Sequence, residues 1–191
     1  MRKCILLIGP LLVLALAFAV PSYADTIYTA TLLGSNEVPP TGSSATGFAT
    51  FTLSGNMLTI DESFTGLTTP ASAAHIHCCG PLGVNEMVAL PFAGFPNTIS
   101  GTYDQTFDLS LAATYTAGFI TQEGGTAALA ESGLIAALNS GNTYANIHNT
   151  TFPGGEIRGQ ITVFTPEPSS LLLFGTGLIA AVQAARKKIR T

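Results

Sequence analysis

A short turn signal, Ser54-Gly55-Asn56, separates two runs in which apolar and polar residues alternate. In the second run, 57–64, Leu58, Ile60 and Phe64 share one face, and Thr59, Asp61 and Ser63 lie on the other. A period of two is typical of a strand that is buried on one face only. A short turn that contains glycine joins two such strands as an antiparallel hairpin. The sequence therefore predicts an antiparallel sheet with one face turned toward a core.

Most of the remaining chain repeats this pattern in short segments. We expect further strands at 26–33, 73–77, 86–92, 102–109, 144–148 and 156–164. The segment 126–138 has a helical period instead, with Thr126 as the N-cap and Gly141 as the stop signal, while 111–120 fits either strand or loop. Many short strands and one short helix predict an all-β fold, an antiparallel sandwich or barrel.

The N-terminal residues have the features of a secretory signal peptide. Arg2 and Lys3 precede an apolar run from Ile5 to Val20, and small residues follow at Ser22 and Ala24. This order of charge, apolar core and small residues is the one that signal peptidase cleaves. We expect residues 1–24 to be a signal peptide, helical in its apolar part, that is removed after Ala24.

The C-terminal residues 166–191 have three parts in order. They are the triplet Pro166-Glu167-Pro168, the apolar stretch 171–182, and the basic cluster Arg186-Lys187-Lys188. This ending resembles the PEP-CTERM sorting signal of Gram-negative bacteria. The resemblance implies a short transmembrane helix that anchors the chain transiently in the inner membrane until an exosortase removes it, and it implies a link to exopolysaccharide and biofilm. The alternative is a plain C-terminal membrane anchor, because a short apolar helix with a positive flank serves both roles.

Between the two terminal signals, charge limits the classes of partner. Residues 25–165 contain ten acidic residues and a single basic one, Arg158, so their net charge is −9. A region with one cation cannot neutralise phosphates, which excludes nucleic acid as a partner. Divalent cations and neutral polymers remain open.

Five sequence blocks in residues 27–164 resemble the CHRD domain, a module of secreted proteins. The blocks are Leu33-Gly34-Ser35-Asn36-Glu37-Val38-Pro39-Pro40, Ala45-Thr46-Gly47 with Ala49-Thr50-Phe51, Ala73-Ala74-His75-Ile76-His77, Tyr144-Ala145-Asn146-Ile147-His148 after the predicted helix, and Phe152-Pro153-Gly154-Gly155-Glu156-Ile157-Arg158-Gly159-Gln160. The resemblance implies an immunoglobulin-like β-sandwich across residues 25–165 with no established catalytic activity.

The three histidines of the chain fall within these blocks. His75 and His77 share one face of a predicted strand, and His148 lies on another strand whose apolar residues alternate in the same way. Neutral imidazoles are good ligands for zinc and copper, so one hypothesis is a metal site. Glu37 or Glu156 would then be a fourth ligand or would orient an imidazole. The alternative is a structural hydrogen-bond network in which Arg158 pairs with one of these carboxylates.

The adjacent Cys78 and Cys79 leave three alternatives: thiolate ligands, a disulfide with each other, or a link between two chains. The sequence contains no Gly-x-Ser-x-Gly motif and no serine or cysteine with an assignable base, so we expect no enzyme. We therefore expect an exported, non-enzymatic protein without a cofactor, located in the cell envelope or extracellular matrix. Its partners would be the processing enzymes and matrix components such as exopolysaccharide. The alternative is a copper- or zinc-binding protein or a weak oxidoreductase.

Overall fold

The computed structural model describes residues 25–165, whose eight strands form one continuous antiparallel sheet. The strands are β1 (Thr26–Leu33), β2 (Thr46–Ser54), β3 (Met57–Thr65), β4 (Ala71–Cys78), β5 (Met87–Pro91), β6 (Gly101–Asp108), β7 (Thr143–Asn149) and β8 (Ile157–Val163). Their order across the sheet is β5-β4-β7-β8-β1-β2-β3-β6. The predicted all-β antiparallel fold is confirmed. The predicted signal peptide and sorting tail lie outside the described residues, and no helix within 25–165 has the length and apolar character needed to cross a membrane.

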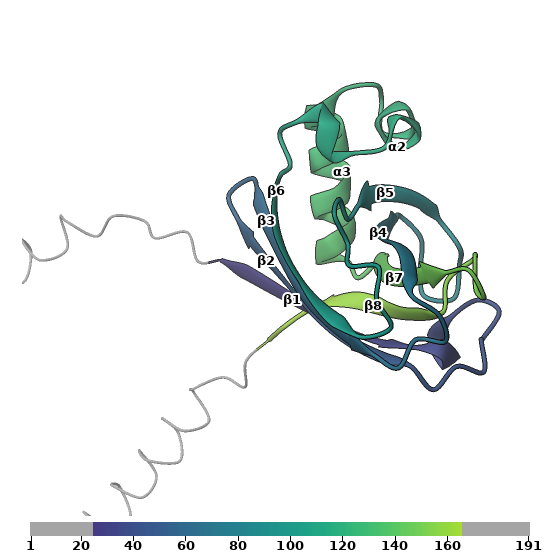
Figure 1. The fold of residues 1–191 in the computed structure, drawn as a ribbon. Coiled ribbons are helices and arrows are strands. Elements are labelled where there is room, and N and C mark those ends of the chain that lie inside the picture. Colours follow the sequence, from purple (N-terminus) through teal and green to yellow (C-terminus); the bar gives the residue numbers. More distant parts are fainter. Residues whose placement is uncertain (1–24, 166–191) are drawn as a thin grey trace, which may run out of the picture.

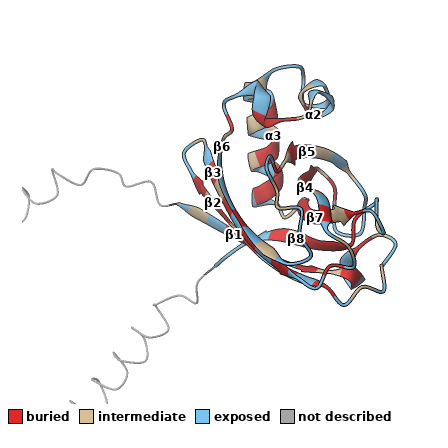
Figure 2. Ribbon diagram, viewed as in Figure 1, coloured by how far each residue is buried: buried red, intermediate tan, exposed pale blue. Residues whose placement is uncertain are grey.

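The sheet curls until its two ends face each other across a shared core (Figure 1). The two walls of the expected sandwich are thus two halves of one sheet. Phe92, just after β5, stacks on Tyr103 of β6 with 5.4 Å between the ring centroids. The Tyr103 hydroxyl also donates a hydrogen bond to the Ala93 carbonyl, at 3.0 Å. Buried residues line the inner side of the curl and the facing side of the long helix (Figure 2).

The curl passes through the pairing of β8 with β1, where a glycine is required. A Cβ atom on Gly159 would lie only 2.7 Å from the carbonyl oxygen of Thr31. Real Cβ atoms are not found so close to a backbone oxygen, so any larger residue would push the two strands apart. Gly159 therefore keeps the two halves of the sheet in contact.

The predicted hairpin and helix are both present. Gly55 occupies the turn between β2 and β3 with φ of 59°, a conformation that glycine adopts without strain. Helix α3 (Ala127–Asn139) begins at Thr126, whose hydroxyl accepts a hydrogen bond from the Leu129 amide. Its buried face packs against the core and consists of Ala130, Leu134, Ala137 and Leu138.

Three short helices were not predicted. They are α2 (Ala117–Gln122) and the 3₁₀ turns η1 (Gly34–Asn36) and η2 (Ala112–Thr114). Helix α2 has six residues and buries only Phe119, so its sequence is too short to show a helical period. It forms because Thr116 caps it and also ties it to the edge strand β5, donating from Oγ1 to the Val88 carbonyl at 2.6 Å. The ambiguous segment 111–120 is therefore helical in part.

One acidic side chain lies inside the core. Glu62 of β3 is fully buried, while its neighbour Asp61 is exposed. Neither carboxylate oxygen of Glu62 has a hydrogen-bond partner among the described residues. Burial raises the pKa of Glu62 from its ordinary value of 4.5 to about 8. The folded chain therefore holds this carboxyl in its neutral form at neutral pH.

Replacing Glu62 with glutamine tests this arrangement. Between pH 4.5 and 8 the unfolded chain loses the Glu62 proton and the folded chain keeps it, so stability falls as pH rises. We expect Glu62→Gln to raise the melting temperature by several degrees at pH 8 and by much less at pH 4.5. Thermal unfolding at both pH values measures this difference. Asp61→Asn controls for loss of one negative charge, and an equal gain in that variant would contradict the explanation by burial.

Candidate metal centre

The pairing of β4 with β7 brings the three histidines together. In β4, Ala74 and Ile76 face the core, which leaves His75 and His77 on the opposite face. In β7, Ala145 and Ile147 face the core in the same way, and His148 projects from the other side. The register places His148 opposite Ala73, one position along the same face from His75. Three imidazoles from two neighbouring strands thus form one cluster.

The cluster has the dimensions of a metal site. The ring centroids of His75 and His148 are 4.9 Å apart, those of His75 and His77 are 5.6 Å apart, and those of His77 and His148 are 6.1 Å apart. One nitrogen from each ring lies within 4.8 Å of the others. His77 is buried, whereas His75 and His148 are partly exposed, so an ion could enter from solvent.

Backbone carbonyls fix the orientation of two of the rings. Nδ1 of His77 lies 2.7 Å from the Glu86 carbonyl, and Nδ1 of His148 lies 2.9 Å from the Pro153 carbonyl. A carbonyl only accepts hydrogen bonds, so each Nδ1 donates and each neutral ring keeps its lone pair on Nε2. Nε2 of His148 is 3.0 Å from Oδ1 of Asn146, an oxygen that only accepts, so the lone pair on Nε2 receives no hydrogen bond from it. Such carbonyl partners are the usual means of orienting histidine ligands.

Two buried nitrogens of the cluster have no partner. They are Nδ1 of His75 and Nε2 of His77. Burial, together with the neighbouring imidazoles, lowers the pKa of His75 to about 4, and burial likewise lowers the pKa of His77 to about 4. Both rings are therefore neutral at physiological pH, and each has a lone pair on one of its two nitrogens. A cation that accepts these lone pairs would satisfy both.

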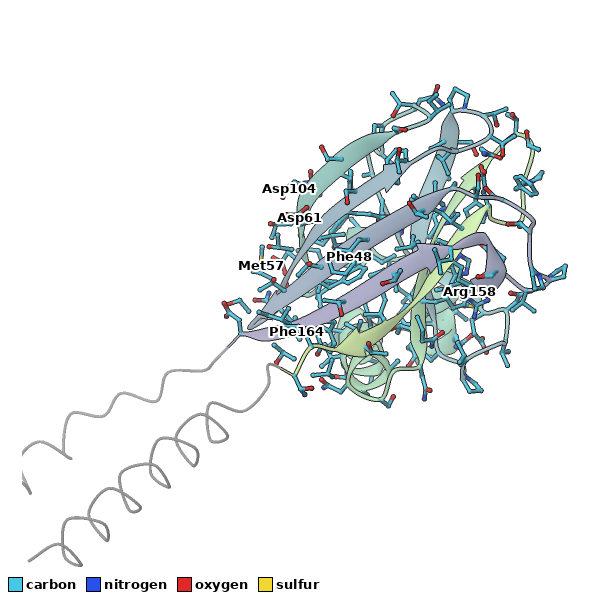
Figure 3. All side chains as sticks on the ribbon, turned by 90° about the horizontal axis from the view of Figure 1, so that it is seen from below. Phe48, Met57, Asp61, Asp104, Arg158 and Phe164 are labelled. Atoms are coloured by element: carbon cyan, nitrogen blue, oxygen red, sulfur yellow. A yellow bond between two sulfur atoms is a disulfide. The ribbon has the colours of Figure 1, made fainter. Side chains whose placement is uncertain are left out.

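Arg158 supports the cluster through Tyr144. The ring of Tyr144 stacks on His77 with 4.6 Å between centroids and 6° between planes, and the Arg158 guanidinium carbon lies 3.3 Å from the centre of the Tyr144 ring. Arg158 is 1% exposed and donates to the Val84 carbonyl at 2.7 Å and to Oδ1 of Asn85 at 3.0 Å. Within residues 25–165 it makes no ion pair, which corrects the expectation that a carboxylate neutralises it. Figure 3 shows Arg158 at one end of β8 and Phe164 just beyond the other.

The two candidate carboxylates lie outside the cluster. Glu156 is fully buried and accepts hydrogen bonds from the Ser43 hydroxyl at 2.6 Å, from the Thr68 amide and hydroxyl, and from the Asn149 amide. Glu37 is 4% exposed, and burial raises its pKa to about 7 against the opposing charge of Arg158. Glu156 connects the loops that contain Ser43 and Thr68. The imidazoles of His77 and His148 are oriented by backbone carbonyls and not by a carboxylate.

The cysteines and two further residues complete the surroundings. Cys78 and Cys79 form a disulfide with each other, and Cys78 is buried in the core on the face of β4 opposite the histidines. Tyr144 and Asn146 were not assigned to the histidine site from the sequence. Both precede His148 at intervals of two along β7, so the alternation could have placed them on the histidine face.

We predict that Arg158→Met lowers the free energy of unfolding by roughly 2 to 4 kcal/mol, because the Val84 carbonyl and the Asn85 side chain lose a charged donor and Tyr144 loses its cation. Arg158→Lys keeps the charge but not the two-pronged geometry, so we expect about half that loss. Urea unfolding measures both. Thr162→Ala, an exposed position on the same strand, is the control and should change stability by less than about 0.5 kcal/mol. A similar loss in all three variants would contradict a specific role for the guanidinium.

Comparison with known proteins identifies two segments. Residues 28–161 match the CHRD domain, and residues 164–187 match the PEP-CTERM protein-sorting motif. No curated protein and no solved structure matches the chain. The sorting motif indicates an exported, envelope-associated protein that an exosortase processes. Because the first match covers most of its length, the chain belongs to the CHRD domain family.

Proposed function

We propose that this exported CHRD domain is a non-enzymatic metal-binding protein that holds Zn²⁺ or Cu²⁺ through His75, His77 and His148. The observation that carries the proposal is a pair of buried, unpartnered imidazole nitrogens in one cluster, where a nitrogen from each of the three rings lies within 4.8 Å of the others. Buried polar atoms are nearly always hydrogen-bonded. Two buried nitrogens without a partner in one cluster therefore indicate that a ligand from outside the chain binds them. Imidazole nitrogens favour zinc and copper over calcium or magnesium.

The surroundings suit an ion of this kind. Histidine ligands bind zinc at about 2 Å, so small side-chain movements would close the cluster around it. Three protein ligands leave one coordination position for water or an outside ligand. The body is acidic, with a formal charge of −9 over residues 25–165 before the neutral form of buried Glu62 is allowed for, and this favours the approach of a cation.

We expect the full chain, purified without a histidine tag, to bind about one zinc or copper ion. His77→Ala removes the most buried ligand and should weaken binding at least about a hundredfold, equivalent to roughly 2.7 kcal/mol. Elemental analysis after dialysis and competition with a coloured chelator measure stoichiometry and affinity, and circular dichroism verifies that the variant folds.

The control variants are Asp61→Asn and Asp104→Asn, which are exposed neighbours across β3 and β6 and could attract cations unspecifically (Figure 3). These variants should keep the ion. Metal that persists in His77→Ala, or that is lost equally in the aspartate variants, would contradict the histidine site.

A second candidate is a weak oxidoreductase activity of bound copper. It is favoured only by the partial exposure of His75 and His148, which would leave the ion open to small molecules. The copper-loaded chain and an equal amount of free copper, compared in a superoxide assay, separate the two candidates. We expect the protein-bound ion to be no more active than free copper.

We further propose that the processed domain acts at the outer surface or in the extracellular matrix of a Gram-negative bacterium, in connection with exopolysaccharide and biofilm. The sorting motif at 164–187 supports an envelope location. We expect removal of residues 166–191 to shift the protein from the envelope fraction to the soluble fraction, measured by immunoblotting. An unchanged distribution would contradict sorting through this tail.

A further inference from the structure

A cavity of about 320 Å³ lies beside the histidine cluster and outside it. One wall is the loop 37–41, which follows η1, and the other is the loop 151–155, which precedes β8. Hydrogen bonds hold both loops in place: the Thr41 hydroxyl donates to the Glu156 carbonyl at 2.7 Å, and the Phe152 amide donates to the Asn149 side chain at 2.8 Å. The cavity is therefore part of the folded structure and needs no ligand to form.

The walls offer rigid apolar surfaces. Pro39, Pro40 and Pro153 lie around the cavity, and Phe152 adds a half-buried aromatic ring. Prolines have no amide donor and little conformational freedom, so they present fixed C–H surfaces. A ligand with a flat or puckered apolar face would pack here with little loss of chain entropy.

A single carboxyl gives the cavity its polar character. Glu37 forms part of the wall and is 4% exposed, and its Oε1 atom has no hydrogen-bond partner among residues 25–165. Gly155 makes room for this group, because a Cβ atom on it would collide with Oε1 and lie 2.7 Å from Nδ2 of Asn146. The Asn146 side chain and the Val38 amide are donors that act on this carboxyl, but neither meets Oε1 within hydrogen-bond limits. Oε1 is therefore the atom that can accept a donor from a ligand.

Charge decides which donor fits. An anion would be repelled by Glu37 and by the acidic body of the domain. A cation would come close to the buried guanidinium of Arg158, whose charge already acts on Glu37. An uncharged hydroxyl group can donate to the carboxyl without either repulsion.

We infer that the cavity between loops 37–41 and 151–155 binds one ring of a neutral sugar, with its apolar face against Phe152 and the prolines and a hydroxyl donating to Glu37. This site is separate from the metal centre, although Pro153 belongs to both: it lines the cavity, and its carbonyl accepts a hydrogen bond from His148. The inference does not rest on metal binding, so it is tested on metal-free protein.

Saturation-transfer NMR and calorimetry on the metal-free full chain test the site, in a detergent without a sugar headgroup. The probes are glucose, N-acetylglucosamine and cellobiose, with glucosamine and glucuronate as the cationic and anionic comparisons. We expect millimolar binding of at least one neutral sugar and weaker binding of both charged ones.

Glu37→Gln keeps the shape of the side chain and removes its charge, so we expect about a tenfold loss of affinity. Phe152→Ala should weaken binding by a similar factor, with thermal unfolding used to verify that each variant is folded. Phe48→Ala is the matched control, since Phe48 is 49% exposed on the outer face of β2 and does not line the cavity (Figure 3).

Three results would overturn the inference: no neutral sugar binds, glucosamine binds more tightly than N-acetylglucosamine, or Glu37→Gln binds as well as the native chain. Repeating the titration with zinc present separates this result from the metal proposal. If the sugar does not bind, zinc binding can still be measured, and if zinc does not bind, sugar binding can still be measured.

Discussion

The backbone pairing between β4 and β7 is the constraint on which the rest of the structure depends. Its register sets His75 opposite Asn146 and His77 opposite Tyr144, so all these polar side chains project from one face. The other face packs into the core with alanine and isoleucine side chains. Because side chains alternate, a slip of one residue would bury the imidazoles and expose the apolar residues. The hydrophobic core and the candidate metal centre are therefore two results of one register.

The buried charged groups are stabilised mainly by neutral partners. Glu156 accepts hydrogen bonds from donors on two separate loops and at the end of β7, and Arg158 donates to a carbonyl and an amide oxygen while its guanidinium lies over the Tyr144 ring. These contacts join the loops around the histidine face to the sheet. Since removal of one partner would leave a buried polar group unsatisfied, each network also fixes its loops. The cavity beside Glu37 and the orientation of His77 both depend on this fixation.

Local signals predicted most of the secondary structure. The hairpin at Gly55 and the cap at Thr126 were correct because each depends on residues close in sequence. Helix α2 was not predicted because it is only six residues long and depends on a contact with β5, the hydrogen bond from Thr116 to the Val88 carbonyl. The partners of Arg158 could not be predicted either, since Val84 and Asn85 are more than seventy residues away and lie in a loop. Long-range contacts of this kind leave no periodic signal in the chain.

The sequence by itself determined which residues face the core and which face outward, because alternation is a property of each strand alone. It also placed His75 and His77 on one face of their strand. The CHRD domain and the sorting motif were likewise recognisable from the sequence alone. Only the tertiary structure decided that one sheet curls to supply both walls, and that His148 joins the other two histidines while Glu156 does not. The physical reason is that strand order and loop position depend on which distant segments pair, and this is fixed by the packing of the whole core.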